Sequence, residues 1–262
     1  MLHISSRHNP RLQEAARLFA SARDRRKAGK CVLEGEHVIA AFAQRHGAPE
    51  SLIVSEDALA RPGTAALIAQ FAERTLVVPE ALLAELAVLP AGVGVIAVVT
   101  APAPQPSAPA DFCLLIDDVQ DPGNVGSMLR TAAAAGVRQV LLSKQCAFAW
   151  SPKVLRAGQG AHFLVDVYEN VDLAAWAAAY RADGGDVVAA TASGGTSLFA
   201  ARLAGRVGVA VGNEGAGLTP ALLDQATQRV TIPMPGGMES LNAAAATAVC
   251  LFECVRQRAA RG

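Results

Sequence analysis

Three segments in the second half of the chain carry polar side chains of the kinds that bind ligands or assist reactions. They cover residues 117–130, 211–218 and 232–242. Each follows an apolar run, bends through glycine or proline, and leads into a helical pattern. Ligands of parallel α/β sheets bind beyond the carboxyl ends of the strands. Three such bends therefore predict one composite pocket.

The first segment places an arginine two turns into a helix. A Pro-Gly turn precedes Asn124, which we expect to cap that helix. Arg130 lies one turn beyond Ser127 on the same helix face, so its guanidinium can reach toward the loop. An arginine there can hold a phosphate or a carboxylate through two hydrogen bonds. The alternative is a surface arginine on an alanine-rich helix.

The second segment surrounds Asn213 and Glu214 with Gly212, Gly215 and Gly217. Glycine lets the backbone approach a ligand closely and expose N–H groups. The G-x-x-G-x-G spacing differs from the dinucleotide fingerprint G-x-G-x-x-G, and no Lys-Ser/Thr pair follows as in a phosphate loop. The charge of Glu214 favours a ligand with hydroxyl or amino donors over a bound pyrophosphate.

The third segment places Ser240 and Asn242 at the start of a helix, where we expect one of them to be the N-cap. The helix after them, residues 243–254, is apolar on nearly all sides, which predicts that it is buried. A buried helix that begins with two polar side chains beside a Gly/Pro-rich loop points to a ligand site.

Strands alternating with helices must position these segments. The predicted strands of the second half are apolar throughout, which indicates a parallel sheet covered on both faces; they are 112–116, 140–143, 163–167, 187–190, 207–211 and 230–232. The first half has the pattern of a smaller α/β layer domain. Residues 101–110 hold four prolines and read as an extended linker. We therefore divide the chain into 1–100, 101–110 and 111–262.

Composition limits the classes of protein. The formal net charge is 0 and 52% of the residues are hydrophobic, which indicates a globular protein with a large core. No apolar stretch reaches the ~20 residues of a bilayer span, and the first residues do not form a signal peptide, so we expect a cytoplasmic protein with no membrane partner. The 5 cysteines include no C-x-x-C pair, so we expect them to be buried thiols and predict no metal site.

The charge is nevertheless uneven. Between residues 7 and 30, only Glu14 and Asp24 oppose a run of basic side chains: Arg7, Arg11, Arg17, Arg23, Arg25, Arg26, Lys27 and Lys30. Such a basic helix and loop is typical of contact with a phosphate backbone. A solvated helix face is the alternative.

The three segments resemble, in order, spacing and residue type, the three motifs of the SpoU (TrmH-like) RNA ribose 2′-O-methyltransferases of the SPOUT superfamily. They read D-P-G-N-V-G-S-M-L-R-T-A, G-N-E-G-A-G-L and I-P-M-P-G-G-M-E-S-L-N. The likeness covers residues 112–262. Residues 1–100 resemble the ribosomal-protein-L30e-like substrate-binding domain often joined to this enzyme domain, through Asn9-Pro10, the basic helix and residues 32–36.

The resemblance implies a parallel sheet with a deep trefoil knot, whereas general topology rules alone favour an ordinary doubly wound sheet. It implies S-adenosylmethionine as the cofactor, held by Gly212, Ile232 and Leu241 with Asn213 and Met234 as neighbours. It also implies an obligate homodimer whose active site lies at the subunit interface. The nearly all-apolar C-terminal helix suits such an interface.

The implied reaction moves a methyl group from a sulfonium to a ribose 2′-oxygen. The family proposal makes Arg130 an activator or base, but arginine stays protonated in ordinary protein settings. Stabilising the developing alkoxide, or gripping the adjacent phosphate, is physically easier. Asn124, Glu214 and Ser240 would orient Arg130 and the ribose, and Asn242 would complete the pocket.

The expected substrate is a guanosine, or another nucleoside, in ribosomal RNA of the 23S type. The basic residues expected to contact RNA are Arg7, Arg11, Arg25, Arg26 and Lys27. Two alternatives stay open: a tRNA 2′-O-methyltransferase, and a non-catalytic RNA-binding or ribosome-assembly protein that retains the cofactor pocket. The motifs do not identify the target nucleotide, nor do they separate housekeeping modification from antibiotic resistance.

Overall fold

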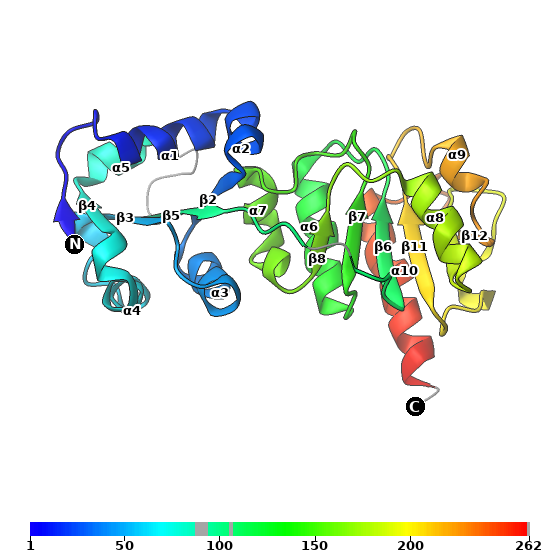
Figure 1. The fold of residues 1–262 in the computed structure, drawn as a ribbon. Coiled ribbons are helices and arrows are strands. Elements are labelled where there is room, and N and C mark those ends of the chain that lie inside the picture. The colour runs from blue at the N-terminus through cyan, green and yellow to red at the C-terminus, as the bar shows by residue number, and fades with distance from the viewer. Residues whose placement is uncertain (87–93, 105–106, 261–262) are drawn as a thin grey trace. The chain divides into compact units, whose positions relative to one another are not determined.

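The computed structural model describes residues 1–86, 94–104 and 107–260 (Figure 1). Contacts divide the chain into two units. Unit 1 comprises Met1–Pro102 and Trp150–Phe163, and unit 2 comprises Ala103–Ala149 and Leu164–Gly262. Residues 105–106 of the expected linker lie outside the described residues. Among the residues described, no helix has both the length and the hydropathy needed to cross a bilayer.

Unit 1 is built on a mixed sheet in the order β1-β4-β3-β5-β2. Strands β1, β4 and β3 are parallel, whereas β5 runs antiparallel to both β3 and β2. The strands are β1 Leu2–His3, β2 Lys30–Glu34, β3 Ser51–Ser55, β4 Thr75–Val78 and β5 Val95–Thr100. The helices are α1 Pro10–Ala20, α2 Ala22–Ala28, α3 Glu36–His46, α4 Pro62–Phe71, α5 Glu80–Leu86 and α7 Pro152–Gly158.

Helix α1 shows why this sequence folds locally as expected. Asn9 is its N-cap and accepts a hydrogen bond from the Arg11 backbone N–H at 3.0 Å, while Pro10 occupies the first turn. The apolar stripe of α1, including Leu12 and Leu18, packs into one core cluster with residues of β3, β4 and β5. Burial of this stripe, rather than helix propensity, anchors the helix on the sheet.

Unit 2 contains a seven-stranded sheet in the order β10-β12-β9-β11-β6-β7-β8, and every neighbouring pair is parallel. The strands are β6 Phe112–Ile116, β7 Gln139–Leu142, β8 Asp166–Tyr168, β9 Asp186–Ala190, β10 Thr196–Ser197, β11 Val207–Val211 and β12 Gln228–Thr231. The expected parallel sheet is confirmed. The strand expected at 163–167 was misplaced: Ala161–Phe163 form a 3-10 turn and the strand begins at Asp166.

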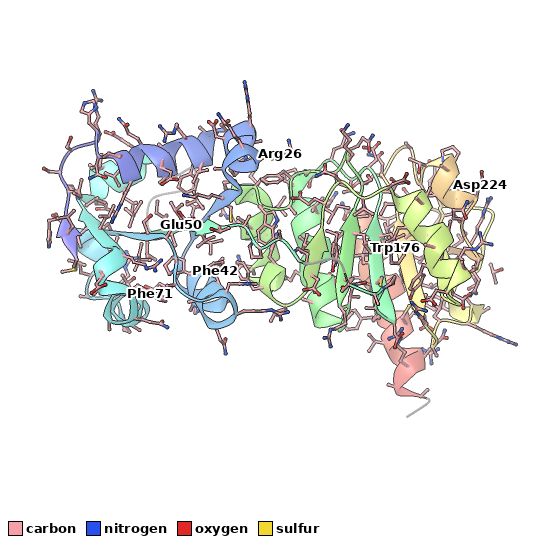
Figure 2. The ribbon with its side chains drawn as sticks, in the orientation of Figure 1. Arg26, Phe42, Glu50, Phe71, Trp176 and Asp224 are labelled. Carbon is pink, nitrogen blue, oxygen red and sulfur yellow. The ribbon has the colours of Figure 1, made fainter. Side chains whose placement is uncertain are left out.

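Helices cover both faces of this sheet (Figure 1). They are α6 Pro122–Ala134, α8 Leu173–Ala182, α9 Pro220–Leu223 and α10 Ala243–Ala259. Helix α8 packs Trp176 and Tyr180 against one face (Figure 2), where a Cβ at Gly208 would lie 3.1 Å from Leu115 Cδ1 and 3.5 Å from the Trp176 ring. Helix α10 packs against β11 and α6. The central strands are thus buried on both sides, which explains their continuous apolar sequence.

Helix α10 is not buried on all sides within one chain, contrary to the expectation from its composition. Thr247, Leu251 and Cys254 lie on its buried face. Phe252 is 48% exposed. An apolar helix with one exposed aromatic face needs a further partner to bury it fully. The 5 cysteines are all free and buried, as expected.

Candidate functional site

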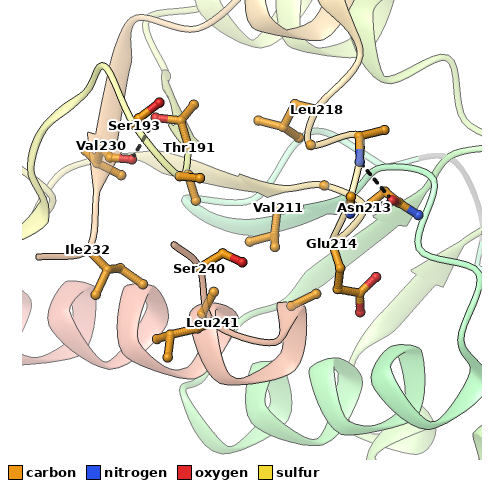
Figure 3. A pocket seen from close by; sticks show the side chains of 18 of the residues that line it. Thr191, Ser193, Val211, Asn213, Glu214, Leu218, Val230, Ile232, Ser240 and Leu241 are labelled. Carbon is orange, nitrogen blue, oxygen red and sulfur yellow. Dashed lines mark hydrogen bonds between the residues drawn. The ribbon is translucent and has the colours of Figure 1, made fainter. Parts of the chain in front are cut away.

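The second and third polar segments line one cavity of about 320 Å³ (Figure 3), and Asn124 of the first segment is hydrogen-bonded to both of them. The cavity lies beyond the carboxyl ends of β9, β11 and β12, because the loops after Ala190, Val211 and Thr231 contribute to it. Its size is within the range of small-molecule sites. Apolar side chains make much of its wall, including Val211, Leu218, Val230, Ile232 and Leu241.

Seven of the residues predicted to hold the cofactor or assist the reaction line this cavity. They are Gly212, Asn213, Glu214, Ile232, Met234, Ser240 and Leu241. All five residues expected to hold the cofactor are among them. Because they come from two loops that the sequence separates by some 20 residues, only the sheet brings them to one place.

The glycine loop is held in shape by its own asparagine. The backbones of Asn213 and Gly217 exchange hydrogen bonds of 3.1 and 2.9 Å. The Asn213 Oδ1 accepts from the N–H groups of Gly215 at 2.9 Å and Ala216 at 3.0 Å. Its Nδ2 donates to the Asp118 carbonyl at 3.1 Å, which ties this loop to the first segment. The Asn213 side chain therefore holds the shape of this loop, which lines the cavity.

Gly212 is required for a different reason than the sequence suggested. A Cβ at this position would lie 2.3 Å from the carbonyl carbon and oxygen of Gly217 and 2.5 Å from the Leu218 nitrogen. Real Cβ atoms do not approach backbone so closely. The close approach is therefore between the two arms of the loop itself. Gly217 adopts a φ of +73°, a left-handed conformation that glycine accepts without strain.

The first segment is anchored by its acidic residues. The buried Asp117 accepts a hydrogen bond from the Thr219 N–H at 2.8 Å. The Asp118 N–H donates to the Ser143 hydroxyl at 2.9 Å. Asp121, and not Asn124 as expected, is the N-cap of α6: it accepts from the Asn124 N–H at 2.7 Å. Asp121 has the extended backbone that an N-cap needs, and Pro122 fills the first turn.

Because Asn124 is released from capping, its side chain links the three segments. Its Nδ2 donates to the Oε1 of Glu214. Its Oδ1 accepts from the Nδ2 of Asn242 at 2.9 Å. Asn242 is the N-cap of α10, and its own Oδ1 accepts from the Ala244 N–H at 3.0 Å and the Ala245 N–H at 3.3 Å. Ser240 lies beside this cap and lines the cavity.

Arg130 occupies a different position from the other predicted residues. It is exposed on α6 and, like Asn124 and Asn242, is not among the described residues that line the cavity, whereas those two asparagines are hydrogen-bonded to each other and, through Asn124, to Glu214. Within one chain the structure therefore brings together Asn124, Glu214, Ser240 and Asn242 but leaves Arg130 on the helix surface.

Two polar residues of the cavity were missed from the sequence. Thr191 and Ser193 follow β9 and line the cavity (Figure 3). The Thr191 hydroxyl donates to the Val230 carbonyl at 3.2 Å, which fixes this loop to the neighbouring strand β12. The polar run after the apolar residues 187–190 is the same signal that identified the other loops, so the end-of-strand argument could have found it.

The basic N-terminal region divides into surface and interior residues. Arg7, Arg11, Arg26 and Lys27 are exposed, as a role in RNA contact requires. Arg25 is not: it is 6% exposed. Its Nη1 donates to the carbonyl oxygens of Leu18 and Phe19 at the end of α1.

This buried position corrects the expectation that Arg25 contacts RNA. Desolvation lowers the pKa of its guanidinium, yet the contact with helix carbonyls satisfies the charge. Arg25 therefore joins the end of α1 to α2. A helical projection of α2, which assigns one face of this short helix to the interior, is the sequence signal that could have indicated the burial of Arg25.

Within the segment 32–36 that resembles the L30e-like domain, Glu36 has a structural partner and Glu34 is partly buried. The Glu36 carboxylate accepts from the Thr64 hydroxyl at 2.6 Å. It lies over Gly63 at the start of α4, where a Cβ would meet it at 2.1 Å. Burial raises the pKa of Glu34 to about 7, against the opposing charge of Arg156. Its buried Oε1 has no hydrogen-bond partner within the described part of the chain.

Comparison with known proteins agrees with this geometry. The model of the SpoU rRNA Methylase family matches residues 111–252. An uncharacterised tRNA/rRNA methyltransferase from Synechocystis is 33% identical over 97% of this chain and 94% of its own length. The chain belongs to the SpoU rRNA methylase family. The resemblance of the three motifs is thereby confirmed.

Two further relatives match different shares of the chain. The Bacillus subtilis 23S rRNA (guanosine(2553)-2′-O)-methyltransferase RlmP is 39% identical over 55% of this chain and 58% of that enzyme. The SpoU methyltransferase AviRb from Streptomyces viridochromogenes, solved in complex with AdoMet, superimposes with a TM-score of 0.85 and 27% identity. That alignment covers 96% of this chain and 100% of AviRb, so both units have counterparts there.

Proposed function

We propose that this protein transfers a methyl group from S-adenosylmethionine to a ribose 2′-hydroxyl of ribosomal RNA. The observation that carries the proposal is the convergence of the second and third SpoU motifs on one cavity, with Asn124 of the first motif bonded to both. Relatives named as 23S rRNA guanosine methyltransferases favour a guanosine in that RNA.

The cavity suits the cofactor. Ile232 and Leu241 offer apolar contact for a flat ring, while Thr191 and Ser193 offer hydroxyls for polar groups. The loop from Gly212 presents backbone groups. When bound, S-adenosylmethionine supplies an electrophilic methyl group on a sulfonium.

The protein side chains must orient and activate the ribose hydroxyl, which is a weak acid and a poor nucleophile. Glu214 lines the cavity and accepts hydrogen bonds from donors such as hydroxyls. Ser240 lies on the opposite loop of the same cavity. Arg130 keeps its proton, so we assign it the stabilisation of the developing alkoxide or of the adjacent phosphate.

Arg130 requires a second copy of the chain to reach such a site. Helices α6 and α10 pack side by side, and they carry the exposed Arg130 and the exposed Phe252, respectively. A two-fold interface over these helices would bury Phe252 and bring the arginine of one protomer toward the cavity of its partner. We therefore propose a homodimer with the active site at the subunit interface.

The path of the chain supports the proposed trefoil knot. After β12, which lies near one end of the sheet, the chain returns to α10, which packs on the central strand β11 and on α6. Residues 232–242 make this return along the cavity that the Gly212 loop also lines. In the proposed knot this return segment threads through a loop of the chain.

Unit 1 is proposed to bind the RNA as an L30e-like domain within residues 1–100, joined by the linker 101–110 to the methyltransferase domain 111–262. Its exposed Arg7, Arg11, Arg26 and Lys27 suit a phosphate backbone. We place the protein in the cytoplasm, where ribosomal RNA is modified.

Purified protein, labelled S-adenosylmethionine and separate transcripts of 23S rRNA and tRNA provide the direct test. Label is expected in the ribosomal RNA, and mapping of 2′-O-methyls in cells with and without the gene should locate one missing position. Methylation of tRNA alone would move the assignment to tRNA. Cofactor binding without transfer to any RNA from gene-deleted cells would favour the non-catalytic RNA-binding protein.

A further inference from the structure

We propose that Asn242 is a positioning residue whose role as helix N-cap sets the direction of a hydrogen-bond relay to Glu214. The relay runs from Asn242 through Asn124 to the Glu214 carboxylate. It holds that carboxylate as an acceptor at the edge of the cavity. The kinetic part of the argument rests on the proposed function, whereas the structural part does not.

The first step is the orientation of the Asn242 amide. An asparagine side chain has one oxygen that accepts and one NH₂ that only donates. Two backbone N–H groups of α10, those of Ala244 and Ala245, point at the Asn242 side chain. Only the oxygen can accept from them, so the cap leaves Nδ2 facing Asn124, at 2.9 Å from its Oδ1.

The orientation of the Asn242 amide also sets that of Asn124. Because its Oδ1 faces a donor, its NH₂ must face Glu214. Asn124 is available for this bridge because Asp121 caps α6 in its place. A flipped Asn124 amide would set NH₂ against NH₂ on one side and oxygen against carboxylate on the other. The cap of α10 thus excludes the wrong orientation of an amide on α6.

The third step concerns the loop that carries Glu214. The internal bonds of Asn213 hold the base of this loop, but they do not direct the Glu214 side chain. The bond from Asn124 does, and it places the carboxylate next to the starts of α6 and α10 (Figure 3). A charge-assisted hydrogen bond of this kind is stronger than a neutral one. A substrate hydroxyl therefore meets an acceptor of defined position.

Asn242→Asp separates the relay from the cap. Aspartate caps a helix as well as asparagine does, but a carboxylate cannot donate to Asn124. We expect a melting temperature within about 2 °C of the wild type, at least tenfold faster amide hydrogen exchange in residues 212–218, and at least a tenfold lower kcat on RNA. Asn242→Ala removes cap and relay together and should also lower the melting temperature.

A rescue tests the direction of the relay. Asn124→Asp should loosen residues 212–218, because two carboxylates then face each other. Adding Glu214→Gln supplies a donor at position 214, so the double variant should regain slow exchange in this loop while methyl transfer stays low.

The proposal would be overturned if Asn242→Asp had the same kcat and the same amide hydrogen exchange in residues 212–218 as the wild type. It would also be overturned if these residues exchanged as fast in the double variant Asn124→Asp, Glu214→Gln as in Asn124→Asp alone. The exchange readout needs no RNA. If the wild-type protein methylated no RNA, the proposed function would fail, and loosening of residues 212–218 in Asn242→Asp would still support the relay.

Discussion

The substitution Gly212→Ala probes the glycine loop with a matched control in the same loop. At position 212, the added methyl group would lie 2.3 Å from the Gly217 carbonyl group and 2.5 Å from the Leu218 nitrogen. At position 215, it would lie 3.6 Å from the Asn213 Oδ1, an ordinary contact. Both glycines line the cavity. If they served only to leave space for the ligand, the two substitutions would weaken ligand binding to a similar extent.

The expected magnitudes follow from these distances. To reach ordinary contact, the two arms of the loop must separate by about 1 Å at position 212, and overpacking against backbone costs about 1–3 kcal/mol. The separation also breaks the paired backbone hydrogen bonds of Asn213 and Gly217. Gly215→Ala should change the free energy of unfolding by less than about 0.5 kcal/mol. From the sequence alone, Gly212 was expected to let the backbone approach the ligand; the structure predicts instead that a side chain at this position distorts the loop.

Thermal unfolding and calorimetric titration with S-adenosylmethionine measure both effects. Gly212→Ala should lower the melting temperature by several °C, at about 2–4 °C per kcal/mol, and weaken cofactor binding at least tenfold. Gly215→Ala should bind the cofactor within about threefold of the wild type, since less than 0.7 kcal/mol separates them. Equal, wild-type behaviour of both variants would refute the close approach of the loop arms.

Three other changes test separate parts of the molecule. Arg130→Ala should leave cofactor affinity and melting temperature unchanged but abolish methyl transfer, as single-turnover assays would reveal; full turnover would remove its role. Arg25→Ala should cost about 3 kcal/mol by chemical unfolding, because two helix carbonyls lose a charged donor, whereas Arg26→Ala should cost under about 0.5 kcal/mol and lower the salt dependence of RNA binding. Glu34→Gln should remove a pH dependence of stability. The pKa of Glu34 is about 7 in the folded protein and 4.5 in its ordinary state, so the wild type loses stability as the pH rises from 4.5 through 7. The variant should therefore be more stable than the wild type by about 1–2 kcal/mol at pH 8, after a discount for solvent screening, and should differ little at pH 4. Equal stabilities at pH 8 would contradict the buried charge.

Local sequence signals predicted most elements, because strands buried on both faces and capped helices follow short-range rules. Apolar runs predicted β6 and β11, and the Asn9-Pro10 pair beside the expected basic helix is where α1 begins. These signals were ambiguous where two nearby residues both suit the same structural role. Asp121 and Asn124 both suit an N-cap, and the extended backbone at Asp121 decided between them.

In the candidate site, too, local motifs identified some residues and only the tertiary structure placed others. The motifs alone identified the residues at the ends of the strands, since glycine, proline and polar side chains after an apolar run require a bend. The polar run after β9 could have marked Thr191 and Ser193 as a further strand end, but their place at this cavity follows from the position of β9 between β11 and β12 in the sheet. Strand order depends on long-range pairing, which local patterns do not encode.

The sequence by itself determined the family, the parallel α/β architecture and the identity of the chemistry-bearing loops, because each depends on residue types at short spacing. The tertiary structure decided which partner each side chain has. It buried Arg25 under the end of α1, set the two arms of the glycine loop in contact at Gly212, and connected Asn242 to Glu214 through Asn124. These contacts join residues far apart in the chain, so their direction and distance follow only once the sheet and its helices are packed.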